Sequence, residues 1–144
     1  KPAPDELPDL LEKSYEHPVW EEKAKMCFSC GSCSLVCPTC YCFDIQDEWH
    51  LDQESCTRCR HWDACMVNEF AEVSLGGQAT ENFRETLGQR MRHRMMRKTA
   101  YLNERLDDQA CVGCGRCSIS CVPDIADPVK IVESILEVSH EQGS

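Results

Sequence analysis

Apolar residues recur at helical spacing in two parts of the chain. Over Thr80–Leu106 they form one stripe at intervals of four and seven residues, which predicts a long amphipathic helix. Asp127 followed by Pro128 is a typical helix start, and the apolar positions after it predict a final helix. The stripes consist of Phe83, Leu87, Met91, Met95, Leu102 and Leu106 in the first segment, and of Val129, Val132, Ile135 and Leu136 in the second.

Shorter helices are predicted elsewhere. Residues 1–8 hold three prolines and predict an extended arm. The sequence "DLLEKSYEH" at Asp9–His17 predicts one or two helical turns, and "PVWEEKAKM" predicts a second helix that begins at Pro18. Asp63–Leu75 predicts another helix, which Gly76-Gly77 would end.

Strand patterns are weak throughout the chain. No segment alternates convincingly between apolar and polar residues. Cys27–Cys65 lacks any sustained periodicity, so we expect loops and short turns there, shaped by whatever the cysteines bind. The predicted secondary structure is therefore mainly α-helical.

Composition narrows the class of protein. The 144 residues include 13 cysteines and carry a formal net charge of −10, which disfavours binding to nucleic acid or to anionic membranes. The cysteines are odd in number and tightly grouped, and the sequence has neither a signal peptide nor a transmembrane segment. We therefore expect a reducing, cytoplasmic setting. Because the sequence begins at Lys1, we also expect a processed chain or a part of a longer polypeptide.

Two cysteine motifs carry the chemistry. Each has four cysteines at intervals of three, three and four residues: Cys27, Cys30, Cys33 and Cys37 in the first, and Cys111, Cys114, Cys117 and Cys121 in the second. Three thiols at successive intervals of three can hold one face of a 4Fe–4S cube. Zinc sites usually take their ligands from two separated pairs, so zinc fits this spacing less well, and disulfides are the other alternative.

The fourth cysteine of each motif is expected to bind the cluster of the other motif, as in two-cluster ferredoxins. One predicted ligand set is Cys27, Cys30, Cys33 and Cys121, and the other is Cys111, Cys114, Cys117 and Cys37. Four thiolates leave no iron open, so we expect electron transfer and predict no catalytic residue.

The predicted fold is a mainly α, α-helical ferredoxin-like domain that binds two 4Fe–4S clusters and has loop-rich cysteine segments. Residues 1–26 are expected to form an N-terminal arm and helices, and residues 27–144 the dicluster domain.

Longer stretches of the chain resemble a known family. The similarity is carried by "HPVWEEKAKMCFSCGSCSLVCPTCYCFD" at His17–Asp44, by "WDACMVNEFA" at Trp62–Ala71, by "GGQATENFRE" and "RMRHRMMRK", and by "CVGCGRCSISC" at Cys111–Cys121. These sequences are similar to a family of iron–sulfur dicluster subunits. The family includes the beta subunit of cytoplasmic sulfhydrogenases and the A subunit of anaerobic sulfite reductases. The resemblance implies a subunit that passes electrons between a catalytic hydrogenase or reductase subunit and a flavin-containing, NAD(P)H-linked subunit.

Five cysteines remain once two clusters are filled: Cys40, Cys42, Cys56, Cys59 and Cys65. Packing beside the clusters is one interpretation, because free cysteine is among the most buried residue types. The other is a third site, in which Cys56, Cys59 and Cys65 bind zinc or a third cluster together with Cys40 or Cys42. We prefer two clusters, since the resemblance requires only two.

Positive charge gathers on the predicted long helix of this acidic chain, at Arg84, Arg90, Arg92, His93, Arg94, Arg97 and Lys98. A solvated helix face is the preferred interpretation. The alternative is that some of these cations compensate the negative charge of the clusters.

The sequence thus predicts an electron-transfer subunit of a redox complex. Two alternatives stay open: a free, diffusible dicluster ferredoxin, which an acidic surface suits, and a zinc-stabilised interaction module.

Overall fold

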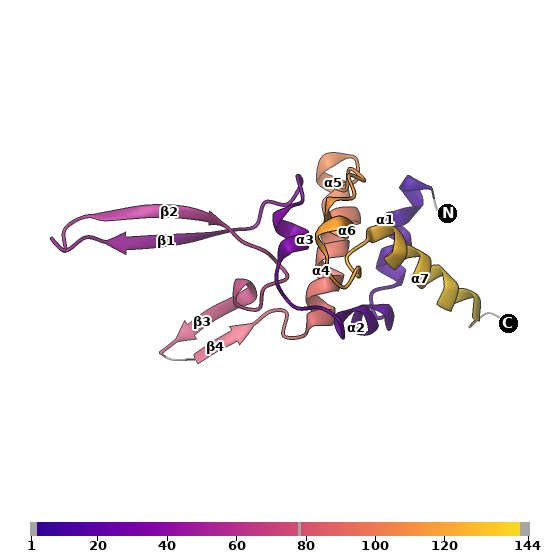
Figure 1. Ribbon diagram of the computed structural model, residues 1–144, viewed down its shortest axis with the longest axis horizontal. Coiled ribbons are helices and arrows are strands. Elements are labelled where there is room, and N and C mark those ends of the chain that lie inside the picture. Colours follow the sequence, from indigo (N-terminus) through magenta and orange to yellow (C-terminus); the bar gives the residue numbers. More distant parts are fainter. Residues whose placement is uncertain (1–2, 78, 142–144) are drawn as a thin grey trace.

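The computed structural model describes residues 3–77 and 79–141. Figure 1 shows the helices gathered together, with two β-hairpins extending from them toward one side. The helices are α1 (Leu7–Lys13), α2 (Val19–Ala24), α3 (Ser32–Leu35), α4 (Leu87–Thr99), α5 (Asn103–Leu106), α6 (Arg116–Ser120) and α7 (Pro128–Glu141), with 3-10 turns η1 (Pro4–Glu6) and η2 (Glu69–Ala71). The strands are β1 (Phe43–Trp49), β2 (Cys56–Trp62), β3 (Glu72–Gly76) and β4 (Ala79–Asn82).

The core surrounds α4, against which α1 and α2 pack. Helix α7 contacts α2, and α3 lies against α6. The buried core side chains come from α1, α2, α4, α7 and adjoining segments: Leu11, Val19, Trp20, Met66, Met91, Met95, Met96, Ala100, Ile125, Ile131 and Ile135. Cys27, Cys33 and Cys121 pack at the edge of this core, so the cysteine motifs are anchored directly on it. The predicted division at residues 26 and 27 stays a prediction.

The prediction of the final helix is confirmed. Helix α7 begins at Pro128, and the Oδ1 atom of Asp127 accepts a 2.9 Å hydrogen bond from the backbone N–H of Val129. Ile131 and Ile135 are fully buried, whereas Val129 is 52% exposed, so the face that packs is offset from the predicted stripe. The two N-terminal helices are also found, as α1 and α2, with Pro18 at the N-cap of α2.

The predicted long helix over Thr80–Leu106 is wrong in its extent. Thr86 forms a capping box with Gln89, because its Oγ1 accepts from the Gln89 N–H at 3.1 Å and its own N–H donates to Oε1 of Gln89 at 3.2 Å. This cap fixes the start of α4 at Leu87. The start of the predicted segment is instead the strand β4, and Phe83 is 68% exposed.

The prediction of a mainly α fold is also wrong, because the structure is 41% helix and 17% strand, with small antiparallel sheets. Strands β1 and β2 pair from Phe43↔Trp62 to Trp49↔Cys56, where loops were expected. Strand β3 occupies part of the helix predicted over Asp63–Leu75. It pairs with β4 because Gly76 and Gly77 have positive φ angles of 95° and 64° and turn the chain instead of ending a helix.

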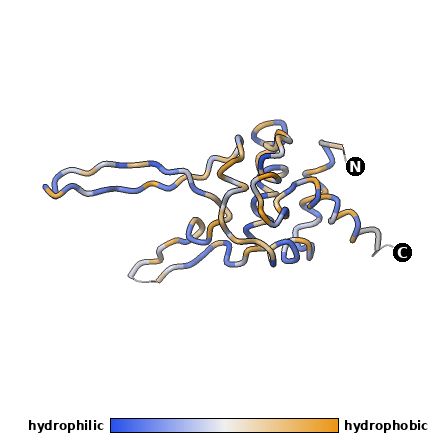
Figure 2. The backbone as a smooth tube through the Cα atoms, viewed as in Figure 1, coloured by the Kyte–Doolittle hydropathy of each residue, from blue (hydrophilic) through white to orange (hydrophobic). Residues whose placement is uncertain are grey.

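The β1–β2 hairpin carries almost no burial. Both strands are exposed along nearly their whole length, and cross-strand side-chain pairs add to the antiparallel backbone pairing that holds the hairpin. Arg58 donates two 2.7 Å hydrogen bonds to the carboxylate of Asp47, and the Arg60 guanidinium lies 4.8 Å from the centre of the Phe43 ring. Figure 2 shows polar and apolar positions mixed along this hairpin.

None of the helices that the structure describes has both the length and the apolar composition that a membrane span requires.

Candidate iron–sulfur sites

The two cysteine motifs adopt the same local geometry. In the first, Ser29 and Gly31 have positive φ angles of 55° and 72°, and in the second the corresponding Gly113 and Gly115 have 64° and 71°. Each motif then enters a short helix, α3 or α6, and these two helices contact each other. Any residue other than glycine would clash at position 31, because a Cβ atom there would lie 2.6 Å from the Cβ of Ala64. The repeat seen in the sequence is therefore a repeat of backbone conformation as well.

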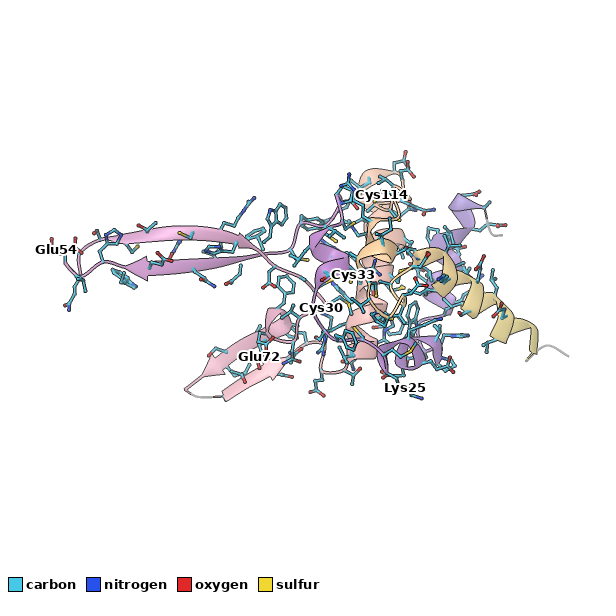
Figure 3. The ribbon with its side chains drawn as sticks, viewed as in Figure 1. Lys25, Cys30, Cys33, Glu54, Glu72 and Cys114 are labelled. Carbon is cyan, nitrogen blue, oxygen red and sulfur yellow. The ribbon has the colours of Figure 1, made fainter. Side chains whose placement is uncertain are left out.

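The predicted cysteines gather in two crossed sets of four. One cavity of about 60 Å³ is lined by Cys27, Cys30, Cys33 and Cys121. A second cavity of about 230 Å³ is lined by Cys37, Cys111, Cys114 and Cys117. Each cavity thus takes three thiols from one motif and the last thiol from the other. Figure 3 labels Cys30 and Cys33 near α3, and Cys114 beyond them on the side of α5.

Three cations of α4 are buried, at 5% exposure for Arg90, 4% for Arg94 and 8% for Lys98. Their spacing of four residues puts them on one face of the helix. The preferred interpretation of this charge as a solvated face is therefore wrong for these three residues. Among the residues that the structure describes, none of the three forms an ion pair with a carboxylate.

Arg90 and Arg94 have different surroundings. Arg90 donates from Nη1 to Oδ1 of Asn68 at 2.8 Å and to the carbonyls of Arg84 and Glu85, so it holds the chain before α4. Arg94 lines both four-cysteine cavities and donates to the carbonyl of Ala126 at 3.1 Å, while its buried Nε has no hydrogen-bond partner. An unpaired buried cation is costly, so its place against the thiols is suited to an anionic occupant.

The thiols respond to the same surroundings. Burial raises the pKa of Cys33 to about 11, although the charge of Arg94 opposes that rise. Burial also acts to raise the pKa of Cys37, but a hydrogen bond with Thr39 and the charge of Lys98 outweigh it and lower the pKa to about 7. Lys98 donates from Nζ to Oγ1 of Thr39 at 2.7 Å, which holds its charge beside Cys37.

The donor set fits a cluster better than a single ion. Within residues 3–77 and 79–141, no group of three or more His, Cys, Asp or Glu side chains converges closely enough to bind one metal ion. A 4Fe–4S cube instead distributes four thiolates over four iron atoms around a central volume. Four thiols around each cavity, with a buried guanidinium beside them, match that requirement.

The remaining thiols divide differently from the sequence-based alternative. Cys56 and Cys59 lie on β2, opposite Trp49 and Gln46 of the exposed hairpin. A third cavity, of about 280 Å³, is lined by Cys40, Cys42 and Cys65. The structure therefore brings Cys65 together with both Cys40 and Cys42, and it does not bring Cys56 or Cys59 into that group.

Other features lie apart from the thiols. Another cavity, of about 550 Å³, runs along α7, and Cys111 is the one cysteine that lines it. Trp20 is a core residue whose Nε1 donates to the carbonyl of Ser14 at 2.8 Å. Trp49 and Trp62 are 69% and 67% exposed on the hairpin. None of the three tryptophans supplies a cluster ligand.

Comparison with known proteins shows the family of this chain. The family model for the 4Fe–4S dicluster domain matches residues 26–125. Sulfhydrogenase 2 subunit beta of Pyrococcus furiosus is 36% identical over 134 residues, which make up 91% of this chain and 37% of that protein. The chain thus spans little more than a third of the relative's length. No solved structure matches.

The family match extends over more than half of the chain and includes both cysteine motifs. The alignment with the sulfhydrogenase subunit covers 91% of this chain and so extends well beyond those motifs. This chain therefore belongs to the 4Fe–4S dicluster domain family and is an iron–sulfur protein related to the sulfhydrogenase beta subunits.

Proposed function

We propose that this chain is a non-catalytic electron-transfer subunit that relays electrons through two 4Fe–4S clusters. The observation that supports this most strongly is the crossed grouping of the thiols, three from one motif and one from the other, around each of two cavities. The proposed ligands are Cys27, Cys30, Cys33 and Cys121 for one cluster, and Cys111, Cys114, Cys117 and Cys37 for the other.

Each cluster, when bound, supplies a one-electron redox centre without an open coordination position. The residues of the chain set the conditions for that chemistry. Arg94 offsets negative charge at both cavities, and Lys98 does so at the cavity of the second motif. Met66 and Met91 line the first cavity, and Met95 lines the second, where their apolar side chains limit access of water. The contact between α3 and α6 keeps the two motifs adjacent, which a relay requires.

The proposed partners are a catalytic subunit of the hydrogenase or the sulfite or sulfur reductase type and a flavin-containing, NAD(P)H-linked subunit. The support is the relative's description as a subunit of a sulfhydrogenase. Cytoplasmic location is part of the same proposal, since 13 free thiols suit a reducing compartment.

The isolated chain is expected to have no turnover of its own. Clusters that are fully ligated by thiolate have no position for substrate, so hydrogen uptake, sulfite reduction and NAD(P)H oxidation should all be absent. The measurement is a set of anaerobic assays on the pure chain, with reduction by dithionite as a control that its clusters are loaded. Substrate turnover by a chain free of other subunits would rule out the relay function.

Native size separates the subunit from a free carrier. Anaerobic gel filtration of native extract should place this chain in a complex with a flavoprotein and a catalytic subunit. Elution alone, at the 16.4 kDa of the chain, would favour a diffusible ferredoxin instead.

A further inference from the structure

We infer that Cys40, Cys42 and Cys65 form a third iron–sulfur site, with His93 as the fourth side chain of the set. The inference goes beyond the proposed function, which needs only the eight cysteines of the two motifs. These four side chains line the same cavity of about 280 Å³. They come from three separate parts of the chain, the segment after α3, the segment after β2, and α4.

The β1–β2 hairpin explains why distant thiols meet. It begins at Phe43 and ends at Trp62, so its closure returns the chain to its starting point. There the N–H of Asp63 donates to the carbonyl of Cys42 at 3.1 Å. Cys42 and Cys65 line the same cavity, and the Oγ of Ser34 lies 3.6 Å from the Sγ of Cys65. Closure of the exposed β1–β2 hairpin thus brings Cys42 and Cys65 together at its base.

The charge around this cavity suits an anionic cluster. Arg94, Arg97 and Lys98 all line it, and among the residues that the structure describes no carboxylate does. Arg94 is 4% exposed, and its Nε has no hydrogen-bond partner. The Arg97 guanidinium lies 5.0 Å from the centre of the Tyr41 ring, which also lines the cavity. Thiolates that hold a cluster would supply negative charge beside Arg94 and Lys98, which are buried, and beside Arg97.

A cluster fits this cavity better than one zinc ion does. Thiolate ligands are typical of both zinc and iron–sulfur sites. The volume of about 280 Å³ also exceeds the 230 Å³ of the cavity that the second motif lines. The third cavity therefore resembles the cavity of the second motif in its thiol lining and its size.

The third site adjoins the cluster site of the second motif. Thr39, Arg94 and Lys98 line both cavities. On its other side the cavity is bordered by Tyr41 and Phe43, which are 47% and 43% exposed at the base of the hairpin. A cluster here would extend the relay from the buried pair of sites toward the surface that carries the hairpin.

Anaerobic analysis of iron, acid-labile sulfide and zinc tests the inference on the full chain. The wild-type chain should contain about twelve iron and twelve sulfide atoms, from three clusters of four. Cys65→Ser and, independently, Cys42→Ser should each contain about eight of both. Cys59→Ser, on the exposed hairpin, is the matched control and should retain the wild-type content. Two separate thiol variants and the wild-type stoichiometry keep the test decisive if one variant folds poorly.

Other results would overturn the third site. About eight irons in the wild-type chain, unchanged by Cys65→Ser, would reject it and leave the two-cluster function intact. About one zinc beside eight irons would identify a single structural ion instead. A wild-type chain without iron would reject the proposed function as well as this site.

Discussion

Replacement of Cys37 by alanine is expected to abolish the cluster bound by Cys111, Cys114 and Cys117, and to spare the cluster of its own motif. Cys37 lines the cavity of the second motif and is absent from the cavity of Cys27. A cube that loses one of four thiolates becomes labile or converts to a form with three irons. Anaerobic electron paramagnetic resonance of the reduced chain, together with iron content, measures the loss.

Cys121→Ala provides the reciprocal control. Cys121 lines the cavity of Cys27, Cys30 and Cys33, so this variant should lose that cluster and keep the one that Cys37→Ala loses. The spectrum of each variant should therefore show the cluster that the other variant has lost. If each variant instead lost the cluster of its own motif, the crossed assignment would be wrong.

Arg94→Gln is expected to make the reduction potentials of both motif clusters more negative. Arg94 lines both cavities and is buried, so its charge is screened little by solvent. At an effective dielectric constant of about 20, a unit charge about 8 Å away changes the energy of an added electron by about 2 kcal/mol. For a one-electron couple this equals roughly 90 mV. Anaerobic redox titration, followed by electron paramagnetic resonance, measures both potentials.

Two companion variants separate charge from packing. Arg94→Lys keeps the positive charge and should restore most of the potential. Arg92→Gln removes a charge from the same helix, but Arg92 lies 3.7 Å from the centre of the Tyr15 ring and 3.5 Å from the carboxylate of Glu16, toward the N-terminal segment. Its effect on the potentials should be small. Equal shifts in Arg92→Gln and Arg94→Gln would show that Arg94 has no special role at the clusters.

The helices were predictable where burial gives them a period. Ile135 in α7, and Met91 and Met95 in α4, occupy the core as the 3.6-residue pattern indicates. The strands were not predictable, because both faces of the β1–β2 hairpin are exposed and the sequence has no reason to alternate. A Gly-Gly pair such as Gly76-Gly77 is typical both of a hairpin turn and of the end of a helix. Only the pairing of β3 with β4 distinguishes the two.

Cysteine spacing predicts which thiols line each of the two cavities, since the spacing reflects a local loop that holds three thiols, and their role as cluster ligands stays a prediction. The grouping of Cys40, Cys42 and Cys65 could not be predicted in this way, because it depends on how the chain returns after the hairpin. The burial of three cations on α4 was also predictable from the sequence. Arg90, Arg94 and Lys98 recur every four residues, which places three cations on the face that carries Met91 and Met95 toward the core.

Native mass spectrometry of the anaerobically purified chain tests the central claim most directly, because it counts intact clusters on one polypeptide. The crossed thiol sets predict a mass above that of the apoprotein by at least two Fe4S4 units, and by three where the third site is also filled. A chain that carries a single Fe4S4 unit, or zinc with no iron and sulfide, would contradict the account.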